Sequence, residues 1–118
     1  MEPHLGNGAS QAMEDAYILA QLISKAIHRP KLDIAGLLNA YSAVRQPFGN
    51  FVVQASRRQG RLCEFNGPGF EEYVEGSTVS PEKIKELGDA INEGWEWTWK
   101  TKVADDLERA LAFLDQID

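Results

Sequence analysis

Apolar residues recur at spacings of three and four near the start of the chain, the pattern of a helix with one apolar face. Between Ala9 and His28 this set is Ala12, Ala16, Leu19, Ala20, Ile23 and Ile27. We expect this face to be buried, with its small alanines letting the helix backbone approach a neighbour closely. Asn7 is the expected N-cap, because its side-chain oxygen can accept an amide hydrogen of the first turn, and Pro30 ends the helix.

A second helical pattern begins near Asp33 and runs past Arg61 toward Cys63. Its apolar set is Leu37, Leu38, Tyr41, Val44, Phe48, Phe51, Val52 and Ala55. Pro47 interrupts the pattern, and because proline removes one backbone donor and clashes with the preceding turn, we expect a kink there rather than an end. The first two helices are thus long, and we expect them to be antiparallel.

The remainder of the chain contains shorter helical patterns. "NGPG" at 66–69 is a strong break, and the stretch up to Ser80 is typical of a short helix followed by a loop. "SPEK" at 80–83 marks a helix start, and a last helix is expected over 101–117. "WEWTWK" at 95–100 alternates like a strand, but the flanking helical patterns favour a helical turn or short connector. The predicted fold class is all-α, with four or five helices.

Composition and charge narrow the function classes. The chain has 118 residues, enough for one small domain, and a net charge of −6 without a densely basic stretch. Binding to nucleic acid or to an anionic membrane is therefore disfavoured. Cys63 is the single cysteine, so we expect no internal disulfide and no metal site. A reducing compartment, the cytoplasm, fits this cysteine usage, and we expect neither a signal peptide nor a membrane span.

"PHLGNGASQAMEDA", residues 3–16, is a glycine-containing turn that leads directly into a helix. A helix N-terminus presents unpaired N–H groups and a partial positive charge, and so can bind an anion. Gly6 and Gly8 permit positive φ and the close approach of a flat ligand. A dinucleotide fingerprint is excluded because Gln11 occupies the third glycine position and no strand precedes. Taken alone, the pattern is also that of an ordinary glycine turn.

The same stretch resembles the last conserved block of the group A flavoprotein monooxygenases, the FAD-dependent aromatic hydroxylases, and most of all their salicylate hydroxylase-like, fungal-type members. The matching residues are Pro3, Gly6, Gly8, Ala9, Gln11, Ala12, Glu14, Asp15 and Ala16. Two further motifs are similar to the family: Tyr-x-x-x-Arg-x-Pro at Tyr41, Arg45 and Pro47, and Ser-Arg-x-x-Gly at Ser56, Arg57 and Gly60. Residues 95–114 resemble the C-terminal tail of fungal members, so the likeness covers nearly the whole chain.

This resemblance implies a set of cofactor-binding residues, namely Pro3, Gly6, Asn7, Gly8 and Ala9. The amides around residues 6–9 would stabilise negative charge on the N1–C2 carbonyl edge of the isoalloxazine of FAD, and the Pro3 region would line the substrate side. Residues 1–30 would be the flavin-edge turn and helix of an incomplete FAD-binding domain, and 31–118 a C-terminal helical region.

The family's Gly-x-Gly-x-x-Gly unit, central Asp-Gly segment and substrate-domain sheet are not found in this sequence. We therefore expect a C-terminal segment of a monooxygenase that hydroxylates an aromatic acid such as salicylate with NAD(P)H and O₂. By itself the chain is expected to be inactive and not to bind FAD tightly. Its partner would be an N-terminal FAD and substrate domain, in cis or in trans. The alternative is a non-catalytic helical interaction module or truncated gene product, with self-association through the alanine face.

Several residues have two readings. His4 can be a catalytic or substrate-contacting group beside the flavin, although a surface histidine is favoured. Glu14 and Asp15 can be an acid/base pair, although a role at the helix dipole or in bonds to neighbouring loops is favoured.

Three further features have a structural interpretation. Cys63 is expected to be a small buried or half-buried side chain. The tryptophans Trp95, Trp97 and Trp99 can form a ligand cage, although packing is favoured. The arginines Arg45, Arg57, Arg58 and Arg61 are expected on a solvated or salt-bridged helix face.

Overall fold

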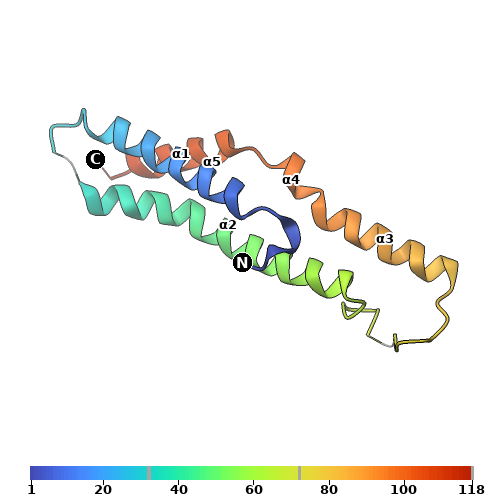
Figure 1. Cartoon of the computed structure of the whole chain (residues 1–118). Helices are drawn as coiled ribbons and strands as arrows, with labels where there is room; N and C mark the ends of the chain where they lie inside the picture. The colour runs from blue at the N-terminus through green and yellow to red at the C-terminus, as the bar shows by residue number, and fades with distance from the viewer. Residues whose placement is uncertain (32, 72, 118) are drawn as a thin grey trace. The chain divides into compact units, whose positions relative to one another are not determined.

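The computed structural model describes residues 1–31, 33–71 and 73–117, and this part of the chain is helical and contains no strand. A short 3₁₀-helix, Pro3–Leu5, precedes five α-helices (Figure 1): α1 (Gly8–Ala26), α2 (Ile34–Cys63), α3 (Pro81–Trp95), α4 (Trp97–Lys100) and α5 (Val103–Asp115). The all-α prediction is confirmed. The alternating "WEWTWK" stretch forms the end of α3 and the single turn of α4, as the helical alternative predicted.

Two helices begin at capping residues of the sequence, α2 after Asp33 and α3 after Ser80, whereas the side-chain cap predicted for Asn7 on α1 is not formed in the part of the chain that the structure describes. Ser80 accepts a hydrogen bond from the amide of Lys83 at 3.2 Å, and Pro81 is the first residue of α3. Asp33 accepts one from the amide of Gly36 at 3.0 Å at the start of α2. The long helix α2 continues through Pro47, as expected. None of the described helices is long and apolar enough to cross a membrane.

The chain divides into two compact units, and α2 contributes residues to both. The turn unit comprises Met1–Gly6 and Val52–Lys100. The bundle unit comprises Asn7–Phe51 and Thr101–Asp118. The division after residue 30 that was drawn from the sequence concerns the longer enzyme and stays a prediction.

In the bundle unit, α1 packs with α5 and with the first part of α2, to which it is antiparallel (Figure 1). One apolar core joins the three helices: Ile18, Leu22, Ala26, Leu37, Ala40, Val44, Ala110 and Leu114. Leu19, Tyr41 and Leu111 are partly buried against it. The core therefore uses all three helices, which explains why helices of modest apolar content are stable here.

The predicted buried face of α1 is wrong. The buried residues of this helix are Gln11, Ile18, Leu22 and Ala26. Of the predicted set only Leu19 is partly buried, while the other five residues are exposed and form what we call the outer stripe: Ala12, Ala16, Ala20, Ile23 and Ile27. The two faces lie about one residue apart, a rotation of roughly 100° about the helix axis.

The turn unit has a smaller core. Leu62, Phe70 and Leu87 are its buried members, and Tyr73, Ala90 and Ile91 pack against them. Leu5 of the 3₁₀-helix is also buried. The rest of this unit is held by close contacts at glycines, described below.

Two further expectations about single side chains are corrected. Cys63, expected to be buried or half-buried, is exposed because it is the last residue of α2. Trp95 and Trp97 are half-buried, in keeping with packing, whereas Trp99 is 64% exposed. Trp95 is the last residue of α3 and Trp99 lies in α4, so the two side chains belong to different helices.

Candidate functional site

The opening turn has the backbone conformation that its glycine permits. Pro3–Leu5 forms a 3₁₀-helix, and Gly6 ends it with φ +60° and ψ +19°, in the left-handed region. The Gly6 amide donates to the carbonyl oxygen of Pro3 at 2.9 Å. Residues with a side chain rarely adopt this conformation. A glycine is therefore needed at position 6 because of the positive φ, and not because neighbouring atoms leave no room for a Cβ.

The bundle unit begins with Asn7 at the N-cap position of α1. The Asn7 carbonyl accepts from the amide of Gln11 at 3.0 Å, but its side chain makes no capping hydrogen bond within the described residues. Gly8 and Ala9 are exposed in the first turn. Gly8 is already helical, so of the two glycines in this turn only Gly6 adopts a positive φ. The first amides of α1 are thus open to an acceptor from outside this segment.

His4 lies against α2 within the turn unit. A Cβ built on Gly60 would stand 2.3 Å from Cδ2 of the His4 ring, so only glycine leaves room for the ring. The amide of Glu2 donates to the Ser56 hydroxyl at 3.3 Å, and Arg57 donates to the Glu2 carboxylate at 3.5 Å. The Ser-Arg-x-x-Gly motif therefore holds the residues that precede Gly6. A catalytic role of His4 stays an untested alternative.

Arg45 forms a charged centre in the bundle unit. Arg45 is 4% exposed, and its guanidinium contacts side chains of two other helices. Nε donates to Asp15 at 2.6 Å, Nη1 to Asp106 at 2.6 Å, and Nη2 to Gln11 at 2.8 Å and Glu14 at 3.3 Å. The guanidinium also stands 5.0 Å from the centre of the Phe48 ring. One arginine of α2 thus joins α1 and α5.

The acceptors around Arg45 stabilise the positive charge of its guanidinium. Burial lowers the pKa of Arg45, but hydrogen bonds from its guanidinium to Asp15 and Asp106 outweigh that effect, so its pKa lies above the ordinary value. Burial and the neighbouring Asp15 carboxylate raise the pKa of Tyr41. Arg45 therefore stays charged at neutral pH.

The arrangement corrects the interpretation of three sequence positions. Glu14 and Asp15 were expected to serve the helix dipole or neighbouring loops, but both pair with Arg45 of α2. Arg45 is salt-bridged as expected but is buried rather than on the surface. The sequence held a signal for this, since Arg45 lies at helical spacing between the apolar Tyr41 and Phe48.

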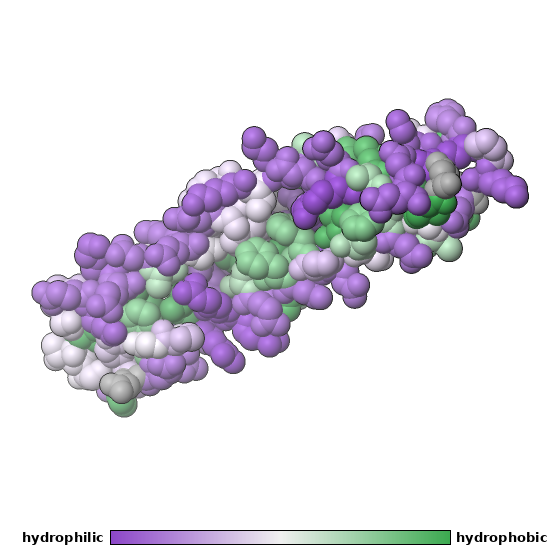
Figure 2. Space-filling view, turned by 180° about the vertical axis from the view of Figure 1, so that it is seen from behind, coloured by the Kyte–Doolittle hydropathy of each residue, from purple (hydrophilic) through white to green (hydrophobic). Residues whose placement is uncertain are grey.

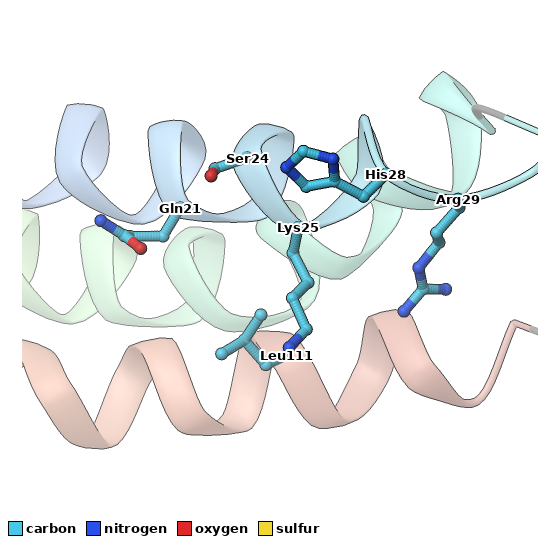
Figure 3. Close-up of a pocket in the computed structure, with 6 residues that line it drawn as sticks. All are labelled: Gln21, Ser24, Lys25, His28, Arg29 and Leu111. Carbon is cyan, nitrogen blue, oxygen red and sulfur yellow. The ribbon is translucent and has the colours of Figure 1, made fainter.

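A surface pocket of about 500 Å³ that the sequence did not predict lies at the other end of α1. Its lining is Gln21, Ser24, Lys25, His28, Arg29 and Leu111 (Figure 3). Arg29 turns toward α5, where it donates to the carbonyl of Leu114 and the carboxylate of Asp115. Basic side chains are what the C-terminal end of a helix favours, so the pocket needs no ligand to explain its charge.

A second pocket is wholly apolar. It has a volume of about 270 Å³ and is lined by Leu19, Ile23, Ile34, Leu37 and Leu38, from α1 and α2. Ile23 belongs to the outer stripe, so the stripe leads into this pocket. The described residues contain no cluster of histidine, cysteine and acidic side chains that could hold a metal ion.

Known proteins that are similar to this chain include two salicylate hydroxylases and one further monooxygenase. The chain is 35% identical over 116 residues to a salicylate hydroxylase of Pseudomonas putida and 29% identical over 112 residues to another. It is 28% identical over 104 residues to the FAD-dependent monooxygenase str9 of Strobilurus tenacellus. No family model and no solved structure matches the chain.

Each alignment covers most of this chain but only a small part of the relative. They span 97%, 93% and 87% of this chain, but only 24%, 23% and 20% of the relatives. The chain therefore spans about a quarter of the length of the curated relatives it matches. The resemblance drawn from the sequence motifs is confirmed: the chain is a relative of salicylate hydroxylases and FAD-dependent monooxygenases.

Proposed function

We propose that this chain is the flavin-edge and C-terminal segment of an FAD-dependent monooxygenase that hydroxylates an aromatic acid, such as salicylate, with NAD(P)H and O₂. The observation that carries the proposal is the open N-terminus of α1 behind the left-handed Gly6, in a chain whose relatives are salicylate hydroxylases. The single cysteine fits a reducing compartment, so we place the enzyme in the cytoplasm.

The proposed cofactor contacts are made by backbone rather than by side chains. The amides of Asn7, Gly8 and Ala9 would donate to the carbonyl edge of the flavin. The Gly6 amide already donates to the Pro3 carbonyl at 2.9 Å, so Gly6 would shape the turn, with Pro3 toward the substrate. The exposed first turn of α1, without a side-chain cap from Asn7, supports this fit. FAD, when bound, supplies the redox chemistry and the activation of oxygen. The chain supplies fixed dipoles where negative charge develops.

The remaining contacts with the cofactor would come from a polypeptide that corresponds to the part of the relatives outside the matched segment. The outer stripe of α1 offers a surface for that part. Its alanines allow close packing, and the stripe leads through Ile23 into the apolar pocket. The face of the molecule that Figure 2 draws from behind also has apolar surface, in green, between purple polar side chains. An exposed apolar surface of this kind is typical of a surface that is covered in the complete protein.

Titration of the purified chain with FAD tests the proposal. Because a helix N-terminus and one turn supply only a few of the cofactor's contacts, we expect no saturable quenching of flavin fluorescence at micromolar concentration and no turnover. Saturable micromolar quenching by the chain alone would contradict the proposal.

The exposed outer stripe also favours a second candidate, a non-catalytic helical interaction module. Size-exclusion chromatography with light scattering separates the two. A concentration-dependent oligomer that persists when a flavin-binding polypeptide of the family is added supports the module. Dissociation of the oligomer in favour of a complex with that polypeptide supports the monooxygenase segment.

A further inference from the structure

Helix α1 has two faces that could be buried, and the less apolar one is buried. The buried face contains the polar Gln11 beside Ile18, Leu22 and Ala26, with the half-buried Asp15 at its edge, whereas the outer stripe contains only alanine and isoleucine. Burial of apolar area alone would favour the reverse choice, because a buried polar group costs free energy unless it is hydrogen-bonded. Another interaction must therefore select the face.

The contacts of Arg45 run to one side of α1 only. Gln11, Glu14 and Asp15 lie on the buried side, and each accepts a hydrogen bond from the guanidinium. A rotation of α1 by roughly 100° that buried the outer stripe would carry all three acceptors away from Arg45. The 3% exposed guanidinium would then keep only Asp106 as an ionic partner among the described residues. Loss of most of the acceptors of a buried guanidinium costs more free energy than the apolar area at stake, because the charge is then only partly compensated.

We propose that Arg45 is a positioning residue that sets the rotation of α1, so that the outer stripe stays on the surface for the rest of the monooxygenase. The use of the stripe rests on the proposed function, whereas the rotation is a property of this chain. Buried polar groups are known to select one register between competing apolar arrangements, as a single buried polar residue does in coiled coils.

Thiol labelling of paired cysteine variants tests the rotation on the 118-residue chain. In a Cys63→Ser background, Ala16→Cys places a thiol on the outer stripe and Ile18→Cys places one in the core. With Arg45 present we expect the thiol at position 16 to react at least about tenfold faster than that at 18, because core positions react only after opening. After Arg45→Met we expect the order to reverse.

Controls separate rotation from loss of structure. Arg58→Met changes an exposed arginine of the same helix and should leave the order unchanged. Arg45→Lys, which keeps one charge, should restore the original order in part. Circular dichroism and labelling rates in urea identify any variant that has unfolded, in which both thiols react equally fast.

If Arg45→Met unfolds the chain, a triple variant takes its place, in which Asp15→Asn and Asp106→Asn remove the two carboxylates that have lost Arg45. A folded variant without Arg45 that retains the original labelling order overturns the proposal. Loss of fold in both variants also overturns it, because Arg45 would then hold the bundle together whichever face is buried. The assay needs neither flavin nor partner, so its result is independent of the FAD titration.

Discussion

The two units of this chain are held together in different ways. The bundle unit has an apolar core of eight residues and a buried arginine with several acceptors. The turn unit has a cluster of three buried apolar residues, with Leu5 and Val52 buried outside that cluster, and it relies on glycines that let side chains lie against a helix backbone. Shortening a core side chain should therefore destabilise the bundle unit, whereas a single methyl group added at a tightly packed glycine such as Gly94 should destabilise the turn unit.

The buried arginine of the bundle unit and the close glycine contact of the turn unit each hold residues of the N-terminal stretch that contains Gly6 and Gly8. Arg45, from the Tyr-x-x-x-Arg-x-Pro motif, holds the residues of α1 that follow Gly8. Ser56 and Gly60, from the Ser-Arg-x-x-Gly motif, hold Glu2 and His4 ahead of Gly6. The two motifs of α2 thus act, each within its own unit, on the two halves of the candidate flavin-facing block.

The largest effect is expected in the core of the bundle unit. Leu22→Ala removes a side chain that is 0% exposed and should lower the free energy of unfolding by about 2–5 kcal/mol. Ile23→Ala, the adjacent residue of the outer stripe, should change it by less than about 1 kcal/mol. Urea unfolding followed by circular dichroism measures both. A larger loss in Ile23→Ala than in Leu22→Ala would mean that α1 buries the face first predicted from the sequence, and would contradict the structure.

The next effect concerns the contact between α2 and α3 in the turn unit. A Cβ on Gly94 would stand 2.1 Å from Oε1 of Gln59, whose Nε2 donates to the carbonyl of Ile91 at 3.1 Å. Gln59 is 1% exposed, so its amide cannot move away without losing that bond. Gly94→Ala should therefore cost about 1–3 kcal/mol.

Gly88→Ala is the matched control in the same helix, since no described atom lies within 4 Å of its added Cβ. There the exchange should stabilise the helix by about 0.5–1 kcal/mol. The two variants are compared in urea unfolding. If Gly94→Ala were as stable as Gly88→Ala, the close glycine contact would not be what holds α3 on α2.

The smallest effect on stability, but a local one, is expected from Gly60→Ala. The added methyl group meets the ring of His4, which is exposed and can turn away, so the free energy of unfolding should change by less than about 1 kcal/mol. The chain has two histidines, so proton NMR resolves the signal of His4 from that of His28. We expect the His4 signal alone to shift.

Gly49→Ala, at a position of α2 with open space around the added Cβ, should leave both histidine signals in place. An unchanged His4 spectrum in Gly60→Ala would show that the ring does not rest on α2 in solution.

Much of the fold could be predicted from the sequence. Hydrophobic spacing and local caps such as Ser80 and Asp33 determine where helices begin and end, and these signals lie within a few residues. The buried face of α1 could not be predicted in this way, because it depends on Arg45, which lies about 30 positions along the chain from Asp15. Periodicity describes one helix at a time and contains no information on a charged partner from another helix.

In the candidate site, too, local features could be predicted from the sequence and contacts between distant residues could not. The left-handed turn at Gly6 follows from a glycine beside a helix start, and the structure has it. The contact of His4 with Gly60 could not be predicted, because both residues are unremarkable in their own segments. The flavin contacts proposed for Asn7, Gly8 and Ala9, and the places of Pro3 and Gly6 beside them, rest on the resemblance and on the open first turn of α1, and they stay a prediction.

A chimera tests the central claim most directly. This chain replaces the matching quarter of the Pseudomonas putida salicylate hydroxylase, and FAD retained after gel filtration is measured together with salicylate-dependent oxidation of NAD(P)H. The account predicts that the chimera retains FAD and turns over, and that Ala16→Asp on the outer stripe abolishes both while the isolated chain with the same change stays folded. A folded chimera that retains no FAD would contradict it.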